Sequence, residues 1–203
     1  MLDNMSSTGK TETRTQILEA ARGMFEELGY YGAGLGAVAK KAGVSRQAIY
    51  LHFPSKAELL TALHLHIFAT DVLPVVERHP ITEEMTALDA LDTMIAVDVV
   101  VISKVWRIHE ALTTARRQHP EVEETLRPRE DDRYGELLDR ARRLKREGDL
   151  PPRMRPGAVA DSLWGLVSVG TYKSLVIERG WSLDRYRRWV RDTIRLQIRA
   201  GDG

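Results

Sequence analysis

The residues best suited to chemistry lie together between positions 45 and 56, in the run SRQAIYLHFPSK. Arg46 can pair with the acceptor edge of guanine, and Gln47 can pair with adenine. Ala48 is small enough to allow close approach of the backbone or to contact a thymine methyl group. We expect these side chains to read base edges in the major groove of DNA, and Ser45, directly before them, is a further candidate DNA-binding residue.

Other side chains of the same run suit phosphate groups better than bases. Tyr50 and His52 carry hydrogen-bonding groups on their rings, and Lys56 lies in the first turn of the following helix, whose N-terminus behind Ser55 also attracts anions. Residues 28–57 contain no Asp or Glu. That charge pattern is expected of a surface facing a polyanion. The alternative is a buried helix pair with a solvated basic edge.

The elements that must position these side chains follow a helix–turn–helix pattern. Ala39 lies where two helices would cross closely. Gly43 follows the first helix, where the chain must take a left-handed conformation. Val44 and Ile49 can fill the angle between the helices, and Ser45 is the expected N-cap of the second, recognition helix.

Helices are predicted on both sides of this pair. Thr13 forms a capping box with Gln16, at the start of an amphipathic helix that Gly29 ends. After the pair, Ser55 caps a helix that Pro74 should end or kink.

The sequence GY…VAKKAGVSRQAIYLHFPSKAELL resembles the N-terminal domain of the tetracycline-repressor-like (TetR) family of bacterial regulators, over about residues 13–60. The resemblance implies an all-α fold, a homodimer, palindromic operator DNA as partner and a C-terminal domain that senses a small molecule. Gly34 stands where the family usually has Ser or Thr, which implies one phosphate contact fewer per subunit. Gln47 replaces a family-typical Gly, which makes it a candidate specificity residue.

Composition sets limits on the remaining possibilities. The chain has 203 residues, 29% of them charged, and a net charge of only +1, so affinity for nucleic acid must come from a local patch. It has no cysteine, which excludes disulfides and thiol-based metal sites and fits a cytoplasmic protein. The start lacks an apolar signal region, and the apolar run 93–106 is too short and too charged to span a bilayer. We therefore expect a cytoplasmic protein with no membrane partner.

Three regions are expected along the chain: a disordered tail at 1–11, a helix–turn–helix DNA-binding domain at 12–60, and a helical ligand-binding and dimerisation domain at 61–203. Thr82 is a candidate cap for the helix after Pro74, and Pro128 should interrupt a later one. One helix is predicted from about 156 to 179, and Ser182 should cap the last helix.

The ligand site is predicted within the C-terminal region. Asp98 interrupts an apolar run, so it either shares a polar stripe with Asp92 or points into a cavity, where it would favour a cationic or hydrogen-bond-donating ligand. Trp106 and His109 share a helical face that suits a pocket wall, with core packing as the alternative for Trp106. The candidate ligand-binding residues are Met94, Asp98, Trp106, His109, Tyr134 and Trp164.

The predicted helix 156–179 is apolar nearly all round, so it should be buried on more than one side. A partner subunit would explain the second side. The candidate dimerisation residues are Leu163, Val167, Gly170 and Trp189. The arginines of the last helix are interpreted as a solvated face.

No catalytic site, metal site or cofactor is predicted. His64 and His66 lie on different sides of a helix, and we find no nucleophile elbow or phosphate-binding glycine loop. The expected function is a ligand-responsive transcriptional regulator, and a repressor in particular. The alternatives are a constitutive DNA-binding protein and an all-helical enzyme.

Overall fold

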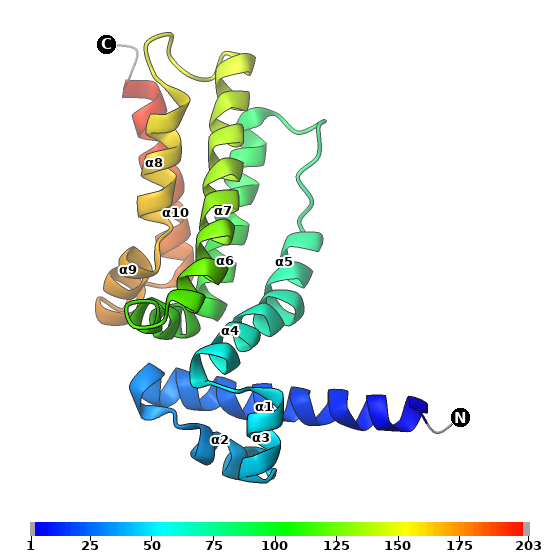
Figure 1. Cartoon of the computed structure of the whole chain (residues 1–203). Helices are drawn as coiled ribbons and strands as arrows, with labels where there is room; N and C mark the ends of the chain where they lie inside the picture. The colour runs from blue at the N-terminus through cyan, green and yellow to red at the C-terminus, as the bar shows by residue number, and fades with distance from the viewer. Residues whose placement is uncertain (1–2, 201–203) are drawn as a thin grey trace. The chain divides into compact units, whose positions relative to one another are not determined.

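The computed structural model describes residues 3–200, and within them every regular element is a helix (Figure 1). The predicted all-α fold is therefore confirmed. The elements are α1 (Asp3–Gly32), α2 (Leu35–Ala42), α3 (Arg46–His52), α4 (Lys56–Ile67), the π-helix η1 (Phe68–Val72), α5 (Leu73–Glu77), α6 (Ala87–Ala115), α7 (Pro120–Glu147), α8 (Pro156–Leu166), α9 (Val169–Tyr172), the π-helix η2 (Lys173–Glu178) and α10 (Leu183–Ala200).

The chain divides into two compact units. Unit 1 contains the residues up to Thr70 together with Arg107–Leu126, and unit 2 contains Asp71–Trp106 and the residues from Arg127 onward. This division differs from the predicted domains 12–60 and 61–203. The end of α6 and the start of α7 belong to unit 1, because Arg107 Nη1 donates to Glu26 O at 2.9 Å and the rings of Tyr30 and His119 meet edge to face.

The core of unit 1 is formed by the apolar stripe of α1 and the inward faces of α2, α3 and α4. Burial of this stripe is the main source of stability for short helices such as α2 and α3, which are marginal alone. The fully or almost fully buried side chains include Ile17, Leu18, Ala21, Phe25, Val38, Ala39, Ile49, Phe53, Leu59, Leu60 and Leu63.

Two features of α1 were predicted differently. The helix begins at Asp3, so Thr13 lies inside it and residues 3–11, which were expected to be disordered, are helical. Residues 1–2 lie outside the described part of the chain. Gly29 has φ 67° and leaves the helical region, as predicted, and a further turn follows to Gly32.

The continuous helical run Lys56–Glu77 is long and apolar enough to cross a membrane, judged by length and composition alone. The apolar run 93–106, which was predicted not to span a bilayer, is a different segment and lies within α6. Leu59, Leu60 and Leu63 of this run are fully buried in the core of unit 1. Pro74 lies just after the π-helix η1, which interrupts the α-helix as expected near a residue that lacks an N–H donor.

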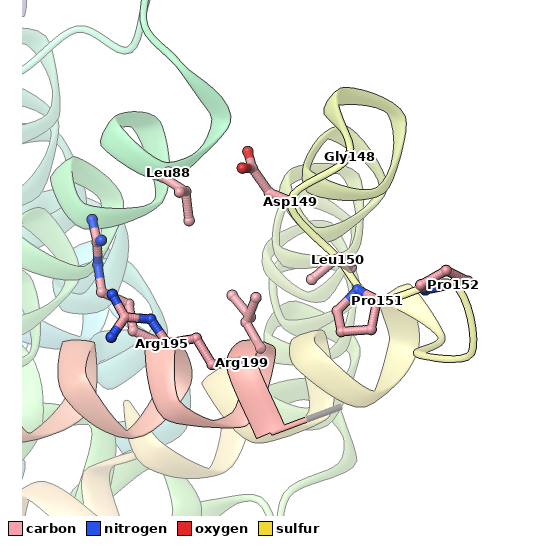
Figure 2. A pocket seen from close by; sticks show the side chains of 9 residues that line it. Leu88, Gly148, Asp149, Leu150, Pro151, Pro152, Arg195 and Arg199 are labelled. Carbon is pink, nitrogen blue, oxygen red and sulfur yellow. The ribbon is translucent and has the colours of Figure 1, made fainter. Parts of the chain in front are cut away.

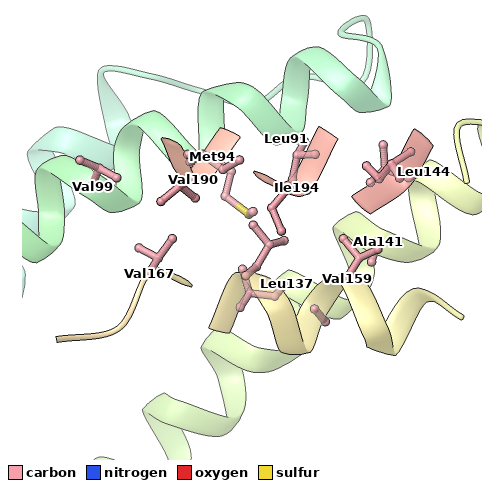
Figure 3. Packing of buried hydrophobic residues seen from close by; sticks show 14 of the residues in the cluster. Leu91, Met94, Val99, Leu137, Ala141, Leu144, Val159, Val167, Val190 and Ile194 are labelled. Atoms are coloured by element: carbon pink, nitrogen blue, oxygen red, sulfur yellow. The ribbon is translucent and has the colours of Figure 1, made fainter. Parts of the chain in front are cut away.

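Unit 2 is a helical bundle whose core is formed by α6, α7, α8 and α10 (Figure 3). Leu91 and Met94 of α6 face Val190 and Ile194 of α10 across this core, and Leu137 of α7 completes it. Two boundaries differ from prediction. Thr86 rather than Thr82 caps α6, through a bond from Asp89 N to Thr86 Oγ1. Helix α7 runs through Pro128, which is exposed, so water can solvate the carbonyl that loses its donor.

The predicted helix 156–179 is broken after Leu166. Ser168 caps the new helix α9, and side chains from elsewhere in unit 2 take up the carbonyls freed at the break. Tyr186 donates to Leu166 O at 2.5 Å, Thr171 to Gly165 O at 2.8 Å, and Arg133 to Val167 O at 3.0 Å. These donors replace the missing helical hydrogen bonds. Because the donors are side chains that the apolar periodicity does not reveal, that periodicity alone predicted one helix.

Candidate nucleic-acid interface

The turn between α2 and α3 has the geometry that the sequence predicts. Gly43 takes the left-handed conformation (φ 69°, ψ 22°), and its N–H bonds to Ala39 O and Lys40 O. Ser45 is extended and accepts a hydrogen bond from Ala48 N at 3.0 Å. This N-cap fixes the start of α3, a helix too short to be stable without such support.

Helix α3 presents one polar face to solvent and fixes the opposite face in the core of unit 1. Ile49 is fully buried, whereas Arg46 and Gln47 are exposed. Tyr50 is 42% exposed. The predicted base-reading residues therefore lie on the accessible side of the helix, except Ala48, which is half-buried.

Leu51 was not among the predicted site residues, yet it is 77% exposed on the same helix. An exposed leucine one position after Tyr50 adds an apolar contact surface beside the polar side chains. The signal in the sequence was the spacing of four residues from Gln47, which places Leu51 on the same face of a helix.

Lys56 is held within unit 1. Its Nζ donates to Tyr30 O at 2.8 Å and lies 4.3 Å from the centre of the Tyr30 ring. Burial lowers the pKa of Lys56, and burial, followed by the negative charge of Glu121, raises the pKa of Tyr30. The ammonium group keeps donors beyond the one that Tyr30 uses, so contact with a phosphate stays a prediction.

His52 is half-buried, and its ring lies 6.2 Å from that of Phe53. Phe53 is buried, and the guanidinium of Arg14 lies 5.2 Å from its ring centre. Arg14 therefore brings a positive charge from α1 to the end of α3. Ser55 caps α4 by accepting from Glu58 N at 3.0 Å, which confirms the predicted cap.

The predicted ligand-binding residues belong to both compact units. His109 lies in unit 1, where its ring meets that of His64 edge to face at 5.4 Å. The others lie in unit 2, where Met94 is buried in the core and Trp106 packs against the ring of Tyr172. A ligand site that combines these residues stays a prediction.

Asp98 has a cationic partner inside unit 2. Arg133 Nη2 lies 3.4 Å from Asp98 Oδ2, and the Arg133 guanidinium lies 5.2 Å from the centre of the Trp164 ring. Burial raises the pKa of Asp98, and the charge of Arg133 opposes that shift. Tyr134 packs against the same tryptophan and donates to Asp161 at 2.7 Å. Because Arg133 is already present, this carboxylate is a weaker candidate for a cationic ligand than the sequence suggested.

Two of the predicted dimerisation residues belong to the core of a single chain. Leu163 is 1% exposed and Val167 is 2% exposed, so neither side chain is available to a partner. The apolar character of this region is explained by packing within unit 2. Gly170 is exposed and Trp189 is half-buried, so both remain candidates.

Unit 2 contains a pocket of about 250 Å³ between α6, the loop 148–152 and α10 (Figure 2). Leu88 faces the loop across the pocket, and Arg195 and Arg199 come from α10. Arg195 is bonded through two nitrogens to the carboxylate of Asp92, at 3.2 and 2.6 Å. None of the predicted ligand residues lines this pocket.

Within residues 3–200, no group of three or more His, Asp or Glu side chains is arranged to hold a metal ion.

Known proteins were compared with the chain. Residues 17–63 match the family of bacterial regulatory proteins named tetR. The regulator UidR of Escherichia coli (strain K12) is 42% identical over 65 residues, 32% of this chain and 33% of UidR. The regulator TtgR of Pseudomonas putida is 52% identical over 52 residues, 26% of this chain and 25% of TtgR. The chain thus aligns with about a third or less of the length of these relatives.

The similarity in fold extends further than the similarity in sequence. A transcriptional regulator from Saccharomonospora viridis, solved in complex with choline, superposes with a TM-score of 0.76 over 91% of this chain and 96% of that one. The identity of the pair is 22%, so this likeness supports the fold alone. Residues 17–63, which contain the helix–turn–helix, are thus similar to the tetR family of bacterial regulatory proteins.

Proposed function

We propose that this protein is a transcriptional regulator, and a repressor in particular, that binds palindromic operator DNA as a homodimer and is released by a small molecule. The observation that carries the proposal is the exposed face of α3. Arg46, Gln47, Tyr50 and Leu51 are accessible on one short helix. Ser45 caps that helix and Ile49 fixes it from below.

The charge of the surrounding surface supports the same proposal. Residues 28–57 contain no acidic side chain, and Lys40 and Lys41 are exposed at the end of α2. With a net charge of +1 for the whole chain, this local excess is what a phosphate backbone would encounter. We assign base contacts to Arg46, Gln47 and Ala48, a thymine methyl contact to Leu51, and phosphate contacts to Tyr50, His52 and Lys56.

The homodimer is proposed to form through outward-facing residues of α8, α9 and α10. Leu196 is 65% exposed on α10, a large apolar side chain without cover from its own chain. Gly165 is exposed, and a Cβ added there would meet open space, so another helix could approach closely. Gly170 and Trp189 complete the candidate surface. Leu196→Glu should yield monomers in analytical sedimentation, and a persisting dimer would place the interface elsewhere.

Selection from a random pool of DNA duplexes tests the function directly. The full-length protein should enrich a palindrome whose half-sites lie about one helical turn, roughly 34 Å, or a multiple of it apart. Arg46→Ala should then lose about 1–3 kcal/mol at one base position and relax the preference there. Arg188→Ala, an exposed arginine of α10, is the matched control and should leave binding unchanged. Failure to enrich any sequence at low salt would refute the proposal.

A further inference from the structure

Unit 2 contains a second pocket, of about 220 Å³, between α5, the middle of α6 and the first turn of α10. It is smaller than the roughly 300–1,000 Å³ typical of pockets for drug-sized ligands. It therefore suits a small molecule or one short alkyl chain. The lining residues are Val75, His79, Ala96, Val97, Val99, Val100, Leu183, Asp184 and Arg187.

The walls of this pocket are aliphatic. Val75 from α5 and Val97 and Val99 from α6 are largely buried, and Ala96 lies between the α6 valines. Val100 is 38% exposed, so the apolar lining continues to the surface. The methylene groups of a ligand bound here would be transferred from water to an apolar surface, and no polar partner would be displaced.

The charged groups at and beside the pocket carry an excess of positive charge, because Asp184 and Arg187 of the lining neutralise each other and Arg188, outside the lining, adds a further guanidinium. Arg187 Nη2 donates to Asp184 Oδ1 at 2.6 Å, and Arg188 Nη1 donates to Asp184 Oδ2 at 2.9 Å. Two guanidinium groups thus share one carboxylate. The N-terminus of α10 adds a partial positive charge, because the first N–H groups of a helix lack intrahelical acceptors.

His79, two residues after the end of α5, adds a hydrogen-bonding group. Its Nδ1 lies 2.9 Å from Val75 O, and a carbonyl oxygen can only accept, so Nδ1 carries a proton. Nε2 of the neutral ring then carries a lone pair and can accept a hydrogen bond from a water molecule or a hydroxyl group.

We propose that this pocket binds a short-chain aliphatic carboxylate, with the alkyl chain among the valines and the carboxylate at Arg187. Binding of the carboxylate does not depend on the function proposed above. Only its role as an effector, a ligand that changes DNA binding, rests on that function. The predicted ligand residues are not part of this pocket, which comes from α5, α6 and α10 instead.

Calorimetric titration of the full-length protein without DNA tests the binding itself. Hexanoate, heptanoate and octanoate should bind with affinities that rise about fourfold per methylene, since each buried methylene contributes a fixed increment. Octylamine, with the same chain and the opposite charge, should bind at least tenfold more weakly than octanoate. Equal binding of the two would overturn the assignment of the carboxylate to Arg187.

Variants locate the site. Ala96→Phe should fill the pocket and abolish octanoate binding. Arg187→Gln should weaken octanoate binding tenfold or more, while Arg188→Gln, which removes the neighbouring partner of Asp184 but does not line the pocket, should change it less than threefold. If Ala96→Phe does not fold, as judged by circular dichroism, the two arginine variants decide. Equal effects of those two variants would overturn the proposal.

The two proposals fail separately. Operator binding measured without octanoate tests the regulator, and octanoate binding measured without DNA tests the pocket. Where both occur, octanoate should weaken operator binding in the wild type and not in Arg187→Gln. Octanoate that binds in the pocket without changing operator affinity would overturn its role as an effector.

Discussion

The two compact units are built from helices stabilised in different ways. In unit 1 the helix–turn–helix is defined by local contacts, such as Gly43 to Ala39 and Ala48 to Ser45, a few residues apart in sequence. In unit 2 the break after α8 is held by Tyr186, which bonds to a carbonyl 20 residues away, and by Arg133, 34 residues away. Local contacts are visible in a sequence, and distant side-chain-to-backbone bonds are not.

All four tryptophans, at positions 106, 164, 181 and 189, belong to unit 2. Tryptophan fluorescence therefore reports unfolding of unit 2, whereas circular dichroism reports helix loss in both units. Comparing the two signals lets each substitution be assigned to one unit.

The largest effect should come from Ile49→Ala, which empties a fully buried position under α3. The substitution should cost unit 1 about 2–5 kcal/mol, and duplex binding should be lost with it. In urea titrations, circular dichroism should show an earlier transition than fluorescence. Leu51→Ala, on the exposed side of the same helix, should alter stability by less than about 0.5 kcal/mol. Equal losses for both would contradict the orientation of α3.

Tyr186→Phe should be next in size. The tyrosine is fully buried and donates to Leu166 O at 2.5 Å, so the substitution leaves a carbonyl unpaired at the break between α8 and α9. The expected loss is about 1–3 kcal/mol, read by tryptophan fluorescence. Tyr50→Phe, the same chemical change on the exposed face of unit 1, should have no measurable effect on that signal. If Tyr186→Phe leaves the free energy of unfolding unchanged, the break does not depend on this bond.

Ser45→Ala tests the local cap. Losing the bond from Ala48 N should cost about 0.5–2 kcal/mol and weaken duplex binding, because α3 is a helix of only 7 residues. Ser182→Ala removes the equivalent cap of α10, where Arg185 N donates to Ser182 Oγ at 3.2 Å. That variant should lose comparable stability in unit 2 and retain DNA affinity, and a matching drop in affinity would show that the units are coupled.

The smallest effect should be that of Asp98→Asn. Burial raises the folded-state pKa of Asp98 above its unfolded value, so the folded state binds this proton more readily. The contribution of Asp98 to the free energy of unfolding is fully present below the pKa of the unfolded state. It declines as pH rises through the pKa of the folded state. Asp98→Asn should remove that decline and be slightly more stable than wild type at neutral pH in urea titrations. Asp139→Asn, at an exposed carboxylate, should follow the wild-type profile.

Sequence reasoning reached the fold of unit 1 because its turns depend on residues with restricted conformations or capping groups, such as Gly43, Ser45 and Ser55. It identified the exposed arginine and glutamine of α3 from their side-chain chemistry and their place in the first turn of the recognition helix. It missed Leu51, because the candidates were chosen for hydrogen-bonding groups or small size and Leu51 is a large apolar residue on the polar face.

In unit 2 the same reasoning placed the core stripes correctly but misassigned what they pack against. Leu163 and Val167 were attributed to a partner subunit, although α6, α7 and α10 of the same chain cover them. For Asp98 the sequence left open a polar stripe with Asp92 or a cavity, because a partner 35 residues away, Arg133, cannot be inferred from helical spacing. The valine-lined pocket was likewise not predicted, since residues from three distant segments form it.

The break between α8 and α9 also has a dynamic consequence. The amides that open α9 lie in a first turn, where no preceding helical carbonyl can accept from them, although helices flank them on both sides. In hydrogen–deuterium exchange this short stretch would lose protection well before the neighbouring turns of α8 and α10. The end of the bundle where α8 is followed by α9 would then be where unit 2 first opens to solvent (Figure 1).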